Sequence, residues 1–243
     1  KTVTFAQGER PLVRMHYYAT HPQSFYGDPR ASSDFPGMAL YGMQVTDMLN
    51  HGDVFQMYFT GCAGNVAAGK YNDGSPEARD GLCERLVKGM AASVAATTYE
   101  PAGELRWTTT PLLLKSRQDA GFTEAECRAE MADEKKGPVA RNGAASTLAW
   151  QMRAQAPIEL SALHINRLSI LHLPGEPAVE YQLYAQESAP DRIVAVAGYG
   201  DCGPGYICLE RFFAEGGYEP TASNTPPESE AVFRAAIGAL LAG

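Results

Sequence analysis

The sequence lacks several features that would assign it to a protein class at once. No apolar run approaches the roughly 20 residues that a membrane-spanning helix needs, and no segment has the charged start and small-residue cleavage site of a signal peptide. Lysine and arginine form no cluster, and the formal net charge is −8 at pH 7. Because nucleic acids and many membrane surfaces are negatively charged, we do not expect this chain to bind them.

Cysteine is sparse, and none of the five cysteines has CxxC or zinc-finger spacing. An odd number leaves at least one free thiol, so a disulfide scaffold is not expected. Cys83 and Cys127 fall in helical stretches, where a cysteine is ordinarily a small buried hydrophobic residue. The chain begins at Lys1 and reads as strand from there, which predicts that an upstream segment has been removed.

Apolar runs with strand character alternate with amphipathic stretches that favour helix, over 243 residues of which 45% are hydrophobic. This alternation predicts an α/β fold of mixed α+β type, in which helices cover a layered mixed sheet and the strand-end loops form one rim. The charged stretch Asp133–Gly137 is the best candidate for a domain boundary, but the pattern continues on both sides of it. We therefore expect residues 1–243 to form a single domain.

The expected strands are Lys1–Phe5, Leu12–Ala19, Val54–Thr60, Glu104–Leu114, Glu159–Leu173 and Ile193–Gly198. The expected helices are Pro36–Leu49, Ser75 to about Thr98, Thr123–Glu134, Val139–Gln155, Pro177–Ser188, Leu209–Gly216 and Pro227–Leu241. Two helix ends are predicted from cap residues. Ser75-Pro76-Glu77 suits a helix start, and Asn50-His51-Gly52 suits a helix end.

Two predicted strands end at residues that can bind a metal ion. His21 follows Leu12–Ala19, and Glu176 follows Glu159–Leu173. A histidine and a carboxylate at separate strand ends suit a catalytic zinc, because its open coordination position must face a cleft. The alternatives are an incidental histidine and a glutamate that only complements a helix dipole. His51, His164 and His172 have weaker claims.

The segment Thr60–Lys70 follows a strand and contains three glycines, so its backbone can approach a ligand closely. The phosphate-loop pattern GxxxxGK[ST] matches Gly64 and Gly69-Lys70, but Tyr71 replaces the serine or threonine that holds magnesium. A tight turn that lets the chain reverse direction explains the glycines equally well. A nucleotide site is not expected here.

Several segments together resemble the neutral ceramidase family, the non-lysosomal amidases that split N-acyl sphingosines, and in particular its short bacterial relatives. The resemblance lies in four segments in the same order: Ala19-Thr20-His21 with Ser24, Gly64-Asn65-Val66, Leu173-Pro174-Gly175-Glu176, and Tyr206-Ile207 leading to Glu215-Gly216-Gly217-Tyr218-Glu219. It implies that the chain is the C-terminal part of a longer ceramidase-like catalytic domain. Because family relatives are commonly exported, it also suggests a secreted or periplasmic protein.

The resemblance implies a catalytic zinc, which the family holds with two histidines, a glutamate and a tyrosine. His21 matches the second histidine and Glu176 the glutamate. The first histidine belongs to a family segment upstream of Lys1, so one further ligand is expected from there. Of the two family tyrosines, the second matches Tyr206 and the first falls on Gly203. Tyr206 is thus the expected tyrosine ligand, unless the ligand is the first of the pair.

A second departure from the family concerns its essential serine, which is replaced by Ala67. If that serine stabilises the oxyanion, Asn65 or a backbone amide of the glycine loop could substitute. If it is a nucleophile, Cys62 is the nearest replacement. The catalytic candidates are therefore Asn65, Cys62 and Tyr206.

These observations support two functions of different classes. The first is a zinc-dependent, ceramidase-like hydrolase that cleaves an amide or ester bond of a small lipid-like substrate through a metal-activated water. The second is a non-catalytic relative that binds an acyl chain or a glycan, which Ala67 and Gly203 favour. A purely structural domain would be favoured if the strand-end loops lay far apart. The oligomeric state is left open.

Overall fold

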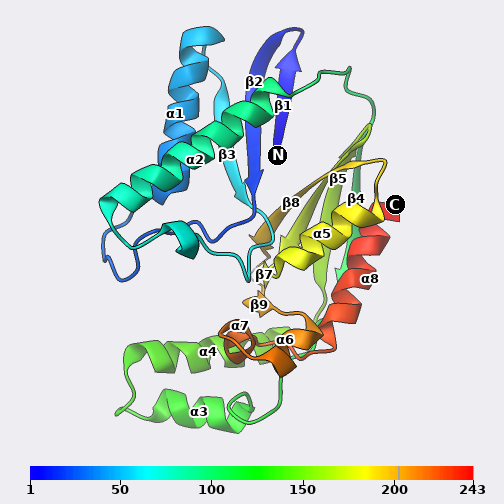
Figure 1. The fold of residues 1–243 in the computed structure, drawn as a ribbon. Coiled ribbons are helices and arrows are strands. Elements are labelled where there is room, and N and C mark those ends of the chain that lie inside the picture. Colours follow the sequence, from blue (N-terminus) through cyan, green and yellow to red (C-terminus); the bar gives the residue numbers. More distant parts are fainter. Residues whose placement is uncertain (202, 243) are drawn as a thin grey trace.

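The computed structural model describes residues 1–201 and 203–242, in which two β-sheets pack face to face between two layers of helices (Figure 1). Residues from both sheets, such as Tyr17, Phe59 and Ile170, form the apolar layer between them. A second apolar cluster joins the first sheet to its helices, and a third and larger one joins the second sheet to its own helices. The mixed α/β class predicted from the sequence is confirmed.

The first sheet has the strand order β1-β2-β3, with β1 antiparallel and β3 parallel to β2. Its strands are β1 (Thr2–Gln7), β2 (Arg10–Tyr18) and β3 (Phe55–Thr60), and its helices are α1 (Asp34–Asn50) and α2 (Pro76–Ala95). The predicted caps are present. The Ser75 hydroxyl accepts a hydrogen bond from the Ala78 amide at the start of α2, and Gly52, just beyond α1, has a φ of 87°.

The second sheet has the order β4-β5-β6-β8 and is covered by α5 and α8 on the face away from the first sheet. Its elements are β4 (Leu105–Leu112), β5 (Ile158–Ile165), β6 (Leu168–Pro174), β8 (Ile193–Gly200), α5 (Val179–Ser188) and α8 (Ser229–Ala242). The single strand predicted over Glu159–Leu173 is wrong. Asn166, at a φ of 51°, begins a two-residue turn that folds this segment into an antiparallel hairpin.

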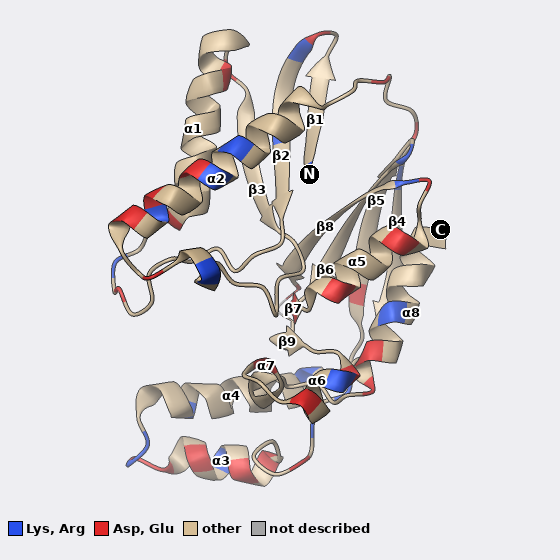
Figure 2. Cartoon of the chain, in the orientation of Figure 1, with Lys and Arg blue, Asp and Glu red and all other residues tan. Residues whose placement is uncertain are grey.

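The remaining elements lie beyond the ends of the two sheets (Figure 1). They are a short 3-10 helix (Gly69–Tyr71), α3 (Glu124–Ala132), α4 (Pro138–Arg153), β7 (Glu176–Pro177), β9 (Tyr206–Ile207), α6 (Glu210–Glu215) and α7 (Glu219–Ala222). α3 begins with a capping box between Thr123 and Glu126 and has an acidic surface (Figure 2). The pairing of β7 with β9 explains why α5 starts at Val179 and not at Pro177, as the sequence suggested.

No helix in the described part of the chain is both long and apolar enough to cross a bilayer. The four cysteines that are described, Cys62, Cys83, Cys127 and Cys208, form no disulfide, and Cys202 lies outside the described residues. The extent of the domain stays a prediction.

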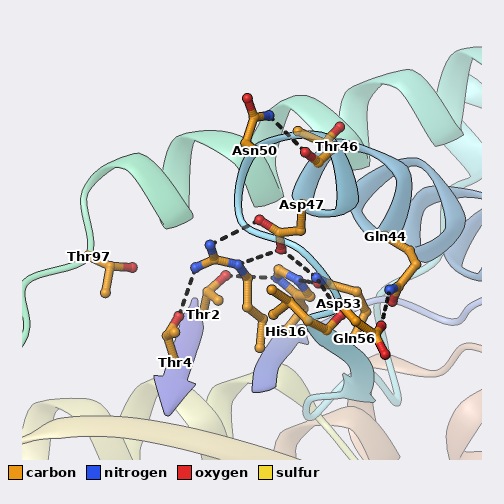
Figure 3. Close-up of polar contacts among 12 residues, drawn as sticks. Thr2, Thr4, His16, Gln44, Thr46, Asp47, Asn50, Asp53, Gln56 and Thr97 are labelled. Atoms are coloured by element: carbon orange, nitrogen blue, oxygen red, sulfur yellow. Dashed lines mark hydrogen bonds and ion pairs between the residues drawn. The ribbon is translucent and has the colours of Figure 1, made fainter. Parts of the chain in front are cut away.

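A buried polar network joins the first sheet to α1 (Figure 3). The Arg14 guanidinium donates two hydrogen bonds to the Asp47 carboxylate, at 2.7 and 3.0 Å. Gln56 donates to the same carboxylate at 2.6 Å and accepts at 2.9 Å from His16 Nε2, while His16 Nδ1 faces the Thr2 hydroxyl at 2.8 Å. Gln56 thereby fixes a proton on Nε2 of His16.

We expect His16 to make the fold less stable in mild acid. Burial lowers its pKa below the ordinary 6.5, and the positive Arg14 and chain terminus add to this, against the hydrogen bond with Gln56 and the negative Asp47. The unfolded chain then binds more protons below pH 6.5, so the free energy of unfolding falls with falling pH, by at most about 1.4 kcal/mol per pH unit. Burial also lowers the pKa of His164 and His172, which contribute with the same sign.

Urea unfolding at about pH 7.5 and about pH 5 measures this effect. A His16→Gln variant should lose less stability between the two pH values than the wild type, because the comparison removes only one titrating group. Equal losses in both proteins would contradict the assignment.

Candidate functional site

The ends of β2, β7 and β9 and the loop after β3 meet at one place. His21 follows β2, Val66 lies in the loop, Glu176 is on β7 and Tyr206 is on β9. β7 and β9 are parallel, and Glu176 lies directly opposite Tyr206. The loop is fastened to the strand end of His21, because the His21 amide donates to the Val66 carbonyl at 2.8 Å. Residues separated by most of the chain are thereby held side by side.

Three side chains converge within this meeting point. His21 Nε2 lies 3.3 Å from Glu176 Oε2 and 3.5 Å from the Tyr206 hydroxyl. The side chains of His21 and Glu176 are 16% and 30% exposed, so the group is shielded but open to solvent on one side. The three candidate metal ligands, which were predicted from separate sequence segments, therefore lie at one site. They are called the three donors below, because each would donate an electron pair to a metal ion.

The orientation of His21 leaves its Nε2 lone pair facing a carboxylate. Its Nδ1 lies 3.1 Å from the Val66 carbonyl, which can only accept, so Nδ1 carries a proton. In the neutral imidazole, Nε2 then has no proton, and two acceptors point at each other across 3.3 Å. Such an arrangement needs a cation between them or a second proton on the ring. In agreement, the hydrogen bond with Glu176 raises the pKa of His21, against the opposing effect of burial.

The spacing of these donors fits a zinc ion as well as a proton. Two ligands at 2.0–2.2 Å from a tetrahedral zinc lie about 3.3–3.6 Å apart, and both measured separations, 3.3 and 3.5 Å, are close to this range. In zinc-bound histidines, the ring nitrogen that does not bind the metal usually donates a hydrogen bond to a carboxylate, a backbone carbonyl or a water. His21 Nδ1 has such a partner in the Val66 carbonyl. Among the described residues, no group of three or more His, Cys, Asp and Glu side chains forms a metal site. At this place the described residues bring together one histidine, one glutamate and one tyrosine.

Aromatic side chains form the wall around the three donors. The Tyr199 ring lies edge-on to His21 with centroids 6.0 Å apart, and Tyr218 lies edge-on to Tyr206 at 5.8 Å. Burial, together with the negative Glu176, raises the pKa of Tyr206 to about 12. In the absence of a metal ion, the Tyr206 phenol therefore stays protonated at neutral pH and is a hydrogen-bond donor.

Two glycines allow the loops to pack closely around Glu176. A Cβ atom on Gly64 would overlap the Glu176 carbonyl oxygen, and the Gly64 amide donates to the Pro177 carbonyl at 2.9 Å. A Cβ atom on Gly203 would overlap the backbone of Gly175. No tyrosine could replace Gly203 without moving this backbone, so Tyr206 is the tyrosine that this arrangement can present to His21.

Replacing Gly64 by alanine should push β7 away from the loop. We expect the free energy of unfolding to fall by about 1–3 kcal/mol, as for other overpacked sites. A Gly69→Ala variant is the matched control, because a Cβ atom there meets nothing within 4 Å. Urea denaturation of both variants measures the difference, and an equal effect of the two changes would show that the close contact at Gly64 is unimportant.

Asn65 binds the start of α5 and not the three donors. Its carbonyl oxygen accepts from the Val179 amide at 2.8 Å, and its amide nitrogen donates to Glu180 at 2.9 Å. The side chain thus holds the loop against the segment that follows Glu176. To stabilise an oxyanion, the Asn65 amide would have to leave Glu180.

Cys62 lies in the largest apolar cluster and is fully buried. Burial raises the pKa of its thiol far above the ordinary value, which disfavours the nucleophilic thiolate. Ala67 is exposed and has no hydroxyl to offer. The other histidines serve elsewhere: His16 and His164 are buried and hydrogen-bonded, and His172 stacks on Trp107.

The sequence did not reveal the supporting residues of this site. The Val66 carbonyl orients His21, but every residue has such a group, so no residue type marks it. Tyr199 was visible as part of a glycine-rich loop, and its φ of 64° places its ring beside His21. The structure places Tyr199 near the end of β8, and an aromatic residue beside glycines at a predicted strand end was the one signal that could have suggested it.

Comparison with known proteins shows similarity in structure and not in sequence. No protein-family model and no curated protein sequence matches the chain. The structure does match the crystal structure of neutral ceramidase from Pseudomonas aeruginosa, with a TM-score of 0.70 and 16% identity over 99% of this chain. The chain shares the fold of part of that enzyme. A second structure, a ceramidase complexed with C2, matches with a TM-score of 0.71 and 14% identity, again over 99% of this chain.

The chain spans about half the length of these ceramidases, 46% and 47% respectively. At this level of identity the comparison supports the fold. It leaves the activity to be argued from the side chains of this chain.

Proposed function

We propose that this chain is part of a zinc-dependent hydrolase that cleaves the amide or ester bond of a lipid-like substrate. The observation that carries the proposal is the approach of His21 Nε2 to Glu176 Oε2, at 3.3 Å, with the Tyr206 hydroxyl 3.5 Å from the same nitrogen. His21, Glu176 and Tyr206 would hold the ion, with a further ligand from outside this chain. The shared ceramidase fold supports the proposal.

Zinc, when bound, lowers the pKa of a coordinated water and polarises a carbonyl group. The residues of this chain provide the setting for that chemistry. Val66 keeps the His21 proton on Nδ1, so that Nε2 faces the site, and Glu176 supplies negative charge there. Where its oxygen is not coordinated to the ion, the Tyr206 phenol stays protonated and can donate a hydrogen bond to the oxygen on which negative charge develops. The rings of Tyr199 and Tyr218 lie edge-on to His21 and Tyr206 and help to hold these two side chains in place.

Hydrolysis of a panel of N-acyl amides and lipid esters tests this proposal. We expect turnover by the zinc-loaded protein, and loss of turnover with a chelator or with His21→Ala. His51→Ala is the control, because His51 is exposed at the end of α1. Turnover that survives both chelator and His21→Ala would rule out the proposed mechanism.

A non-catalytic ligand-binding protein is the second candidate. Ala67 in place of the family serine, and an Asn65 amide already bound to Glu180, favour it. Saturable binding of an acyl or glycan ligand without any turnover by the zinc-loaded protein would support this candidate against the first.

A further inference from the structure

A cavity of about 370 Å³ lies between α2 and the first sheet, apart from the three donors described above. Its inner wall is apolar and comes mainly from Phe35, Leu82, Leu86 and Met90. The volume is at the lower end of the range of small-molecule sites, about 300–1,000 Å³. The cavity adjoins the candidate metal site, because Thr20, Val66 and Ala67 also line it.

Positive charge is concentrated around this cavity. Its lining includes Lys1, Lys70 and Arg85 but no aspartate or glutamate, although the whole chain has a net charge of −8. The Lys1 ammonium is already hydrogen-bonded to the Val194 carbonyl. Lys70 and Arg85 form no ion pair with any described residue; both lie against the Tyr71 ring, at 5.3 and 4.5 Å from its centroid. Two exposed cations, Lys70 in the 3-10 helix and Arg85 on α2, therefore border an apolar interior, although α2 also carries acidic residues (Figure 2).

The side of α2 that lines the cavity carries a glycine, which leaves space in the cavity unfilled. Arg85, Gly89 and Ser93 follow one another at intervals of one helical turn, and all three line the cavity. A Cβ atom on Gly89 would meet nothing within 4 Å, so the space beside this turn of the helix is empty of protein atoms.

We propose that this cavity binds an aliphatic carboxylate. The chain of the ligand would lie along Leu82, Leu86 and Met90, and its carboxylate would pair with Arg85 and Lys70 at the opening. An apolar interior binds the chain by removing it from water, and a guanidinium can bind a carboxylate through two parallel hydrogen bonds. This inference goes beyond the proposed hydrolase and requires no metal ion.

Isothermal calorimetry with decanoate at about pH 7.5 tests the proposal, with decanol and decyltrimethylammonium as ligands of similar length and different charge. We expect decanoate to bind one-to-one, and the other two to bind at least about tenfold more weakly. The Lys70→Gln/Arg85→Gln variant should weaken decanoate binding about tenfold or more. Lys88→Gln is the control, because Lys88 is exposed on the same helix and does not line the cavity.

A Gly89→Leu variant tests the apolar part of the site, because it fills the empty space and also favours the helix. It should abolish decanoate binding and keep the circular dichroism spectrum of the wild type. His21→Ala should bind decanoate as the wild type does, which separates this site from the proposed metal centre. The proposal is overturned if decanol binds as tightly as decanoate, if the double charge variant binds normally, or if His21→Ala abolishes binding.

Discussion

Replacing Asp47 by alanine should lower the free energy of unfolding by about 3–5 kcal/mol, the usual cost of removing one partner of a buried ion pair. The Asp47 and Arg14 side chains are 4% and 2% exposed, and Asp47 accepts two of the three hydrogen bonds that the guanidinium donates. Without Asp47, the positive charge of Arg14 stays buried with no opposite charge, and Gln56 loses an acceptor. Urea unfolding monitored by circular dichroism measures the change.

Two further variants show whether the cost comes from the unpaired charge. In an Arg14→Met/Asp47→Leu double variant both charges are absent, so most of the lost stability should return. Arg128→Ala is the control, because its ion pair with Glu124 is exposed and should contribute less than about 0.5 kcal/mol. If the double variant were no more stable than Asp47→Ala, packing and not charge would explain the loss.

The second large effect is expected in zinc binding. His21→Ala and Glu176→Gln should each lower the affinity for zinc by about a hundredfold or more, because a four-ligand site stabilises zinc by about 10–16 kcal/mol in all. Glu176→Gln is nearly isosteric, so it removes the charge of the ligand and keeps its shape. Titration of the protein with zinc against a competing chelator measures the affinities.

Two controls accompany this titration. His51→Ala removes an exposed histidine and should leave the affinity unchanged. Gly69→Ala alters the first residue of the 3-10 helix at a position with free space, and it should also have no effect. A wild-type affinity in both His21→Ala and Glu176→Gln would mean that zinc binds elsewhere or not at all.

Much of the fold could be predicted because it depends on local sequence. Ser75-Pro76 sets the start of α2, and Gly52 marks the end of α1 through a backbone conformation that glycine adopts easily. The hairpin at Asn166 was missed because its turn contains no glycine and both of its strands are apolar. β7 and β9 were missed because two-residue strands exist only through their pairing, which no local pattern records.

The side chains of the candidate site could be predicted from the sequence, whereas the contacts that position them could not. His21 and Glu176 were predicted as metal ligands from their places at the ends of predicted strands, and Tyr206 from the resemblance to the family. The distances between these three side chains depend on how the two sheets pack against each other, which cannot be predicted from local sequence patterns. The engagement of Asn65 by Glu180 and the burial of Cys62 also follow from tertiary packing, and both emerged only from the structure.

X-ray absorption at the zinc edge of the zinc-loaded protein tests the central claim most directly. A single zinc held by His21 and Glu176 should have only nitrogen and oxygen ligands, at about 2.0–2.2 Å, and the signal of imidazole should decrease in His21→Ala. A sulfur ligand at about 2.3 Å, a spectrum unchanged by His21→Ala, or the absence of bound zinc would contradict the account.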